Sequence, residues 1–493
     1  MRKISIKGAS WDSVFLAVAR VLTILFNILS TKILSVGLDL ETYGTYSQTL
    51  LVSSIGTSVI AMGLADALNY FFNKKKHDVD DHTRQRIINS IFLLEILLGL
   101  VFAAVVIFGQ SVAVGYFSNP KLYGLLIPVA FLPVFSNLLQ FYHVLYVSVG
   151  KAKKMSFFNL ISLAVKLVSV CLAVYVFKDL LWIFIVLLGL DVAMVLIYHI
   201  SLYHNGVFIH PFKSSHKHFP AILAYSIPMG VFAITSALTR ELDKLVIGRL
   251  ADTEALAIYT NCSKVLPLDF LVTAFATVLI PYIVQYVTEE KKELSVKLFS
   301  SYLKVGYYSV WTLGVTVLVA PSTVISFLYS DDYTTGLAVF VAYIFDSMLR
   351  FASMHLILTA ANKAKYIMGC SLLSLAMNLV LNVVLYYALG MLGPAIATLI
   401  CALTYTGLIL NKSIRTVDSR WRDVFNWREV TYLILTLVLL WCGAFALNHL
   451  LLYVSVNRFV AMFVSMAVFG VGALAIHFQK ISATLREINS FRL

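Results

Sequence analysis

Long apolar segments separated by short polar loops run through the whole chain of 493 residues. A helix of about 20 apolar residues, rising 1.5 Å per residue, crosses the hydrocarbon core of a bilayer. Each segment is expected to be helical, because a helix pairs its own backbone groups where no water is present. We therefore predict an all-α membrane protein with 14 transmembrane helices. The predicted spans are 11–35, 46–71, 87–109, 122–148, 156–177, 181–203, 219–249, 256–286, 297–328, 335–360, 366–389, 393–411, 430–450 and 457–478.

The loops carry most of the basic side chains, and these are unevenly divided between the two sides of the membrane. With fourteen spans, 26 lysines and arginines fall on one side and 4 on the other, namely Lys121, Lys178, Arg249 and Arg458. Because positively charged loops stay in the cytoplasm, both termini are predicted to be cytoplasmic. The formal net charge of +13 thus indicates membrane orientation, and no nucleic-acid partner is predicted.

Composition agrees with a membrane protein, since 60% of the residues are hydrophobic and only 13% are charged. The five cysteines all fall within spans and form no Cys-x-x-Cys pair, which argues against disulfides and a zinc site. The first apolar segment contains Arg20 and lacks a small-residue cleavage site, so no cleaved signal peptide is predicted.

The two halves of the chain repeat one another. An Asp-x-Glu-x4-Tyr turn begins at Asp39 and again at Asp252, 213 residues later (252−39). Since six spans separate the copies, the halves share one orientation, which is a parallel repeat that favours alternating access. We expect an N-terminal six-helix bundle at 1–204, a C-terminal six-helix bundle at 205–412, and helices 13 and 14 with a cytoplasmic tail at 413–493. Further pairs, at an offset of 212, are Lys151 with Lys363, Lys153 with Lys365, and His143 with His355.

Charged residues inside the spans are the candidates for function. Each central charge costs at least about 2.5 kcal/mol on insertion scales, so it should face a wet cavity or a charged partner. The spans hold eight basic and seven acidic residues. Those retained as substrate-binding candidates are Arg20, Lys166, Arg240, Lys244, Lys264 and Arg350. Those retained for ion coupling or charge pairing are Glu95, Asp191, Asp243 and Asp346.

Some of these charges have a purely structural alternative. Arg240, Asp243 and Lys244 share one helix face at i, i+3 and i+4, so they could form an internal ion pair, with Glu241 meeting a neighbouring helix. Asp346 and Arg350 are spaced in the same way. Arg20 and Lys166 have no acid one turn away and are therefore favoured as ligand-binding cations. His143 and His355 could bind protons, but packing at equivalent places explains them as well.

Three short motifs in this order resemble those of Wzx-type oligosaccharide-lipid flippases and polysaccharide exporters. This resemblance covers essentially the whole chain and places it in the multidrug/oligosaccharidyl-lipid/polysaccharide exporter superfamily. Pro394 departs from the usual alanine of the third motif. The motifs are Glu41-x-Tyr43-Gly44-x-Tyr46, Asp243-Lys244-Leu-Val-Ile-Gly248 followed by Ala257-x-Tyr259, and Gly390-Met-Leu-Gly393-Pro-Ala395-Ile-Ala397-Thr398.

The resemblance implies two six-helix bundles around a central cavity and the translocation of a lipid-linked sugar. The implied substrate is an undecaprenyl-diphosphate-linked oligosaccharide repeat unit, moved to the outer leaflet of the bacterial inner membrane for O-antigen, capsule or exopolysaccharide assembly. Arg20-Val21-Leu22 resembles the arginine of lipid II flippases, where a cationic cavity receives the diphosphate. The implied partners are membrane lipids, a polysaccharide polymerase and glycosyltransferases. No cofactor is expected, and an H⁺ or Na⁺ gradient would supply the energy.

Other classes of protein explain the sequence less well. A cation-coupled multidrug antiporter would have a cavity dominated by acids, which eight basic against seven acidic span residues do not favour. A membrane polysaccharide polymerase would need a large extracytoplasmic loop, and none is present. There is no Walker A motif for an ATP-driven pump. A scaffold would leave the charges at membrane depth unexplained, so we expect a transporter and not an enzyme.

Overall fold

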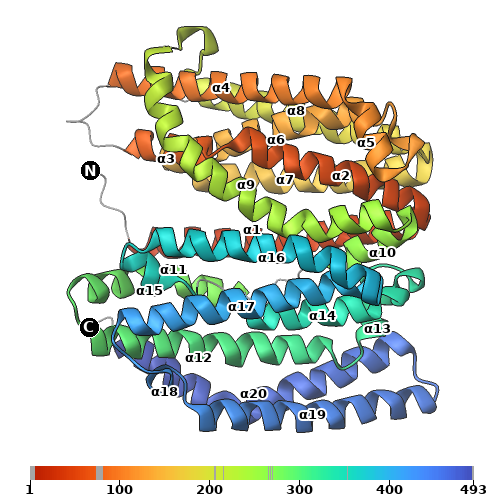
Figure 1. Ribbon diagram of the computed structural model, residues 1–493, viewed down its shortest axis with the longest axis vertical. Helices are drawn as coiled ribbons and strands as arrows, with labels where there is room; N and C mark the ends of the chain where they lie inside the picture. Colours follow the sequence, from red (N-terminus) through yellow and green to blue (C-terminus); the bar gives the residue numbers. More distant parts are fainter. Residues whose placement is uncertain are drawn as a thin grey trace. The chain divides into compact units, whose positions relative to one another are not determined.

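The computed structural model describes residues 6–73, 81–204, 207–214, 216–264, 266, 268, 270–351 and 354–490. Within these residues the regular structure is helical, as Figure 1 shows. Contacts divide the chain into two compact units, Met1–Ala257 and Ile258–Leu493, and each is described by itself. The boundaries of the two six-helix bundles, placed after residues 204 and 412 from the sequence, stay a prediction.

The first unit is built around α6, which packs against α2, α3, α4, α7 and α8. Its side chains Phe141, Tyr142 and Tyr146 are fully buried in the main apolar core of this unit. The helices α1 and α7 pack together, and α9 lies against α2 and α3. The elements are α1 (Ile6–Gly37), α2 (Leu40–Ala61), α3 (Leu64–Asn73), α4 (Asp81–Phe108), α5 (Gln110–Phe117), η1 (Pro120–Leu122), α6 (Leu126–Ser148), α7 (Ala152–Leu172), η2 (Ala173–Phe177), α8 (Leu180–Tyr203), η3 (Pro211–Lys213), η4 (His216–His218), α9 (Phe219–Leu250) and α10 (Thr253–Cys262), the last of which crosses into the second unit.

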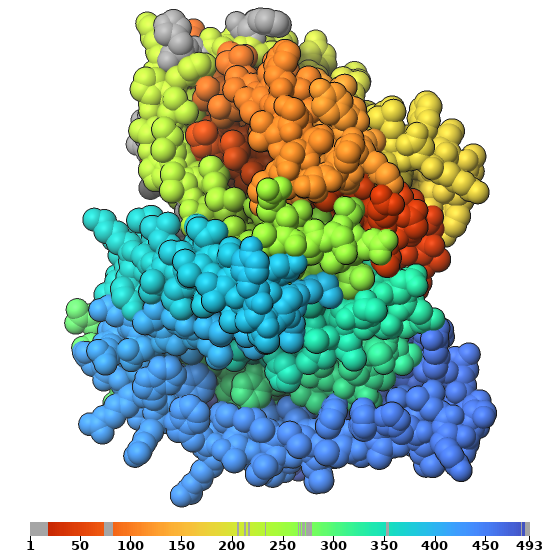
Figure 2. Space-filling view, turned by 45° about the vertical axis from the view of Figure 1, so that its right-hand side comes forward, coloured from red at the N-terminus to blue at the C-terminus, as the bar shows by residue number. Residues whose placement is uncertain are grey.

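The second unit is centred on α12, which contacts α11, α14, α18, α19 and α20. The helices α16 and α17 pack together, as do α19 and α20. Figure 1 shows α19 and α20 side by side, and Figure 2 shows the blue atoms of this C-terminal region at the surface of the unit. The elements are α11 (Phe270–Thr288), α12 (Lys292–Val317), α13 (Pro321–Leu328), η5 (Asp331–Gly336), α14 (Leu337–Leu349), α15 (Leu356–Ala360), α16 (Ala364–Leu389), α17 (Leu392–Thr416), α18 (Trp421–Val424), α19 (Trp427–Tyr453) and α20 (Arg458–Ser490).

The predicted second span is broken between α2 and α3. Met62 and Gly63 both have left-handed backbone angles, with φ of 35° and 71°. A Cβ atom on Gly63 would lie 2.7 Å from the carbonyl oxygen of Ser226 in α9, and one on Gly230 would lie 2.8 Å from the Cα atom of Met62. Two glycines therefore let α9 cross α2 and α3 at very close range.

The chain is a multi-pass membrane protein. In its described part, 11 helices are long and apolar enough to cross a bilayer, or 12 if α12 and α13, bent by 82°, form one span. Large apolar side chains such as Val176, Leu439 and Val471 are exposed on the helix surfaces, as expected where lipid replaces water. The two other predicted spans, 256–286 and 335–360, are not in this count, because each is split into two shorter helices. The number of fourteen spans therefore stays a prediction.

The order of helices recurs along the chain. The start of α1 precedes that of α9 by 213 residues (219−6), and α2 precedes α10 by 213 (253−40). The offset is 211 for α4 and α12 (292−81) and for α6 and α14 (337−126). It is 212 for α7 and α16 (364−152) and for α8 and α17 (392−180). These spacings follow the sequence repeat, while the superposition of the halves in space stays a prediction.

Candidate functional site

The ten candidate residues divide between the two units. Seven lie in the first unit, on α1, α4, α7, α8 and α9, and three lie in the second, at the ends of α10 and α14. Their partners decide which charges are available to a ligand.

Lys166 and Asp191 form an ion pair between α7 and α8. The Lys166 Nζ atom lies 3.9 Å from Oδ1 of Asp191, whose side chain is only 11% exposed. The chain reverses through the π-helical segment η2 and Lys178, whose φ of 54° ends that segment, and so α8 returns beside α7. The acid missing from the sequence neighbourhood of Lys166 is thus supplied by the next helix. The ligand role of Lys166 stays a prediction.

On α9, the internal ion pair uses a different acid from the one expected. Lys244 Nζ lies 2.8 Å from Oε2 of Glu241, one turn earlier, and both side chains are 17% exposed. Ser54 of α2 donates a hydrogen bond to the other oxygen of Glu241 at 3.1 Å. Asp243 is buried and accepts a hydrogen bond from the backbone N–H of Lys244 at 2.8 Å. Glu241 therefore both neutralises Lys244 and ties α9 to α2.

Arg20 on α1, Arg240 on α9 and Arg350 at the end of α14 are the exposed guanidinium groups of this set. Among the described residues, neither Arg20 nor Arg240 has a hydrogen-bond or ion-pair partner for its side chain, whereas Arg350 is paired with Asp346. An arginine at membrane depth without an acid is expensive in lipid, so such a group should face water or an anion. A guanidinium can donate two parallel hydrogen bonds to a phosphate group. Arg20 and Arg240 therefore differ from Lys166, Lys244 and Arg350, each of which has an acid beside it.

Glu95 on α4 is buried in the apolar core of the first unit and is 2% exposed. Its Oε2 atom has no hydrogen-bond partner among the described residues. The side chain of Tyr142 on α6 lies close enough to Glu95 for an electrostatic interaction between them. The Tyr142 hydroxyl also shares a hydrogen bond of 2.8 Å with Nδ1 of His199 on α8. A buried carboxyl without a cation is most stable in its neutral form.

The ring of Tyr142 stacks on that of Tyr198 of α8, with ring centres 6.2 Å apart, and Tyr198 shares a hydrogen bond of 3.2 Å with His143 of α6. His143 also lines a cavity of about 230 Å³ together with Asn69 and Gln140. Glu95, Tyr142, His143, Tyr198 and His199 form what we call the α4–α6–α8 polar cluster. Sequence reasoning missed Tyr142, Tyr198 and His199, because residues more than fifty positions apart carry no local signal of their contact.

In the second unit, two candidate basic residues, Arg350 and Lys264, lie at or just beyond the C-terminal ends of helices. Arg350 ends α14 and forms an ion pair with Asp346, one turn earlier, as its i, i+4 spacing predicts. Lys264 follows α10, donates a hydrogen bond to Oδ1 of Asn261 at 2.8 Å, and lies 5.9 Å from the ring centre of Tyr329. Interrupted helices at membrane depth are tolerated where they line a cavity or are buried in protein. Asp269, a further acid in this region of the sequence, lies outside the described residues.

The fold defined by these two units is shared with membrane transporters of known structure. A lipid II flippase MurJ in an inward closed conformation superposes with a TM-score of 0.70 at 13% identity, covering 96% of this chain and 99% of that one. An inward-facing multidrug resistance MATE family transporter of the MOP superfamily gives 0.65 at 12% identity, covering 82% and 98%. A MOP superfamily transporter from Pyrococcus furiosus gives 0.56 at 10% identity, covering 82% and 94%. The protein therefore has the fold of the MOP superfamily.

A narrower assignment comes from the sequence family. A family profile described as polysaccharide biosynthesis protein matches residues 34–338, which is more than half of the chain. The protein belongs to this polysaccharide biosynthesis family. A search of curated protein sequences gave no match.

Proposed function

We propose that the protein is a flippase that moves undecaprenyl-diphosphate-linked oligosaccharide repeat units from the cytoplasmic to the outer leaflet of the bacterial inner membrane. The polymer would be O-antigen, capsule or exopolysaccharide, and a polymerase and glycosyltransferases would act beside it. Membership of a polysaccharide biosynthesis family and the MOP fold both support this role. Transport, and not catalysis, is consistent with the names of the similar structures, which are a flippase and transporters.

The observation that carries the proposal is that two exposed arginines, Arg20 and Arg240, have no acid beside them among the described side chains. Lys166, Lys244 and Arg350 have acids beside them, so each would have to leave a partner before binding an anion. Arg20 and Arg240 have no such partner among the described side chains, and their guanidinium groups suit the oxygens of a diphosphate. Alternating access would then carry the bound diphosphate between the leaflets.

Arg20→Ala should lower export of the polymer by about 10- to 100-fold, because each charge-assisted hydrogen bond contributes about 1.5–3 kcal/mol. Arg20→Lys keeps the charge without the planar fork and should retain part of the activity. The measurement is surface polymer, accumulated lipid-linked sugar and membrane level of the protein in a deletion strain.

Arg458→Ala is the matched control, since Arg458 is an exposed arginine already paired with Asp331 at 3.0 Å. It should export normally. Normal export by Arg20→Ala would remove Arg20 from the substrate site. Lost export accompanied by lost protein would show instead that Arg20 is needed for folding.

Ion coupling is the second part of the proposal. We expect an H⁺ or Na⁺ gradient to drive transport, and the buried carboxyl of Glu95 supports a proton. The same feature would suit a cation-coupled multidrug antiporter, whose fold this chain shares. Drug sensitivity of the deletion strain separates the two functions. A flippase predicts loss of polymer with unchanged drug sensitivity.

A further inference from the structure

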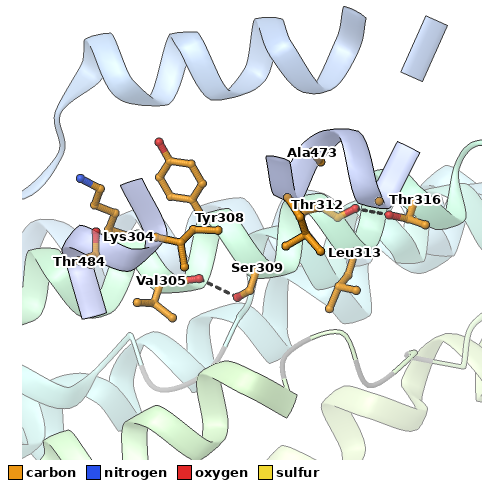
Figure 3. A pocket seen from close by; sticks show the side chains of 12 residues that line it. Lys304, Val305, Tyr308, Ser309, Thr312, Leu313, Thr316, Ala473 and Thr484 are labelled. Atoms are coloured by element: carbon orange, nitrogen blue, oxygen red, sulfur yellow. Dashed lines mark hydrogen bonds between the residues drawn. The ribbon is translucent and has the colours of Figure 1, made fainter. Parts of the chain in front are cut away.

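A cavity of about 500 Å³ lies between α12 and α20 in the second unit, and Figure 3 shows its lining side chains. Its size falls within the range of about 300–1,000 Å³ that small-molecule sites occupy. Lys304 and Thr484 stand at one end, while Thr316 and Ala473 stand toward the other (Figure 3). None of the ten candidate residues lines it, so this cavity is separate from the site proposed for transport.

The walls of the cavity are suited to hydrocarbon. Three of the hydroxyl groups along it donate hydrogen bonds within their own helices: Ser309 donates to the carbonyl oxygen of Val305 at 2.6 Å, and Thr316 to that of Thr312 at 2.7 Å. Thr484 does the same with Lys480 at 2.9 Å. Because these donors are satisfied, they present mainly their carbon atoms. Gly470 and Ala473 widen the space by having almost no side chain.

The end at Lys304 is charged. Lys304 Nζ lies 2.7 Å from Oε2 of Glu429 on α19, and both side chains are partly exposed, at 22% and 25%. Lys480 of α20, one turn before Thr484, holds its ammonium 4.0 Å from the ring centre of Tyr432. Lys304 and Lys480 carry two positive charges and Glu429 one negative charge, so these three side chains together have a net charge of one positive unit. The predicted topology places this end at the cytoplasmic surface of the membrane.

Two buried polar atoms beside this end have no partner among the described residues. They are Oη of Tyr308, which lines the cavity, and Nδ1 of His477, whose ring centre lies 5.3 Å from that of Tyr308. Both residues are almost fully buried, at 2% and 1% exposed. The other ring nitrogen of His477 is bonded to Thr436 at 3.0 Å. Buried polar atoms are rarely left without a partner, so a ligand with polar atoms at this depth is indicated.

We propose that this cavity binds an anionic glycerophospholipid of the bilayer, with one acyl chain between α12 and α20. The phosphodiester lies by Lys304 and Lys480, and an ester or glycerol oxygen pairs with the hydroxyl of Tyr308, which lines the cavity. The single positive charge matches a phosphodiester, whereas a diphosphate carries more negative charge than this group can balance. A long polyprenyl chain would overfill the cavity. The proposal depends on the membrane location of the protein and not on what it transports.

The probe is phosphatidylglycerol carrying a photoreactive diazirine in its acyl chain, used with the purified full-length protein in nanodiscs. Labelling should map to peptides of α12 and α20. Ala473→Phe places a ring in the cavity and should reduce this labelling about tenfold. Val471→Phe, two residues away and with a wild-type side chain that is 68% exposed, adds the same ring outside the cavity and should label like wild type.

The headgroup is tested with a zwitterionic phosphatidylethanolamine probe, which should label about fivefold less, since each lysine near a membrane surface contributes about 1 kcal/mol. Lys480→Gln should remove most of that preference.

Gly470→Leu serves as a second variant with a filled cavity if Ala473→Phe elutes as an aggregate. Equal labelling of filled and wild-type proteins, or equal labelling by both probes, would overturn the proposal. So would displacement of the probe by polyprenyl diphosphate but not by unlabelled phosphatidylglycerol, which would assign the cavity to the transported lipid. Loss of labelling with normal polymer export would separate this site from the flippase function.

Discussion

At the scale of single residues, the buried charges of the first unit differ in how they are stabilised. Asp191 has Lys166 beside it, and Glu241 has both Lys244 and the hydroxyl of Ser54. Glu95 has an oxygen atom without a hydrogen-bond partner among the described residues, although it is as deeply buried as any of them. An ionised carboxylate in that position would be costly, so the neutral form fits the fold. Loss of its proton would therefore favour a conformation in which water or a cation reaches Glu95.

Glu95→Gln tests whether this proton matters for transport. Glutamine has the same size and stays neutral, so the variant should reach wild-type levels in the membrane. If a proton leaves Glu95 during each cycle, polymer export should fall about tenfold or more despite normal protein level. The measurement is surface polymer and protein abundance in the complemented strain.

Glu41→Gln is the control with the same chemical change. Glu41 is exposed and pairs with Lys121 at 2.8 Å, and such surface pairs contribute at most about 1 kcal/mol. Its export should be unchanged. An active Glu95→Gln protein would mean that the carboxyl is a packing element and that coupling occurs elsewhere.

At the scale of helices, the repeated Asp-x-Glu-x4-Tyr turn has a structural role. Asp39 caps α2 by accepting hydrogen bonds from the backbone N–H and the hydroxyl of Thr42, at 2.8 Å and 2.9 Å. Asp252 accepts one from the backbone N–H of Ala255, three residues on, at 2.6 Å. The closing tyrosine of the second turn, Tyr259, is fully buried. The motif thus starts a helix and anchors it in the core in both halves of the chain.

Asp39→Ala should lower the free energy of unfolding by about 1 kcal/mol near neutral pH, or shift the melting temperature by about 2 °C. Burial acts to raise the pKa of Asp39, but the hydrogen bonds from Thr42 outweigh it and lower the pKa below its ordinary value. A lowered pKa in the folded state means that the stabilisation is present above the unfolded pKa and is lost as the pH falls through the folded pKa. The difference between wild type and Asp39→Ala should therefore shrink in acid.

Thermal unfolding in detergent, followed by tryptophan fluorescence, measures this difference. Asp39→Asn keeps an acceptor that does not titrate, so its stability should stay near that of wild type at neutral pH. A constant gap between wild type and Asp39→Ala down to acid pH would contradict the capping role.

The helices also show what could be predicted from the sequence and what could not. The hydrophobic pattern predicts the long spans well, because length and apolarity are local properties. The split of 256–286 has a sequence signal in Pro267, since the residue before a proline avoids helical angles. The split of 335–360 has none, because neither proline nor glycine stands between Arg350 and His355. The partner of Lys166 was equally hidden, because Asp191 lies on another helix.

At the scale of the whole molecule, loop charge is the strongest constraint on orientation. The predicted topology keeps Gly150 and Asp332 on opposite sides of the membrane. A phosphatase fused after Gly150 should be inactive and one fused after Asp332 active, with a cytoplasmic reporter giving the opposite result. Cytoplasmic activity at Asp332 would require a different number of spans.

The unequal lengths of neighbouring helices have a consequence for the membrane that surrounds them. The 32 residues of α9 extend about 48 Å, while the 24 residues of α8 in the same unit extend about 36 Å. A hydrocarbon core of about 30 Å produces a much larger hydrophobic mismatch for α9 than for α8. Thinning of the bilayer should therefore tilt α9 more than its neighbours, and the close crossing at Gly63 and Gly230 would have to follow that tilt. Through this unequal response, bilayer thickness acts directly on the helix that carries Arg240.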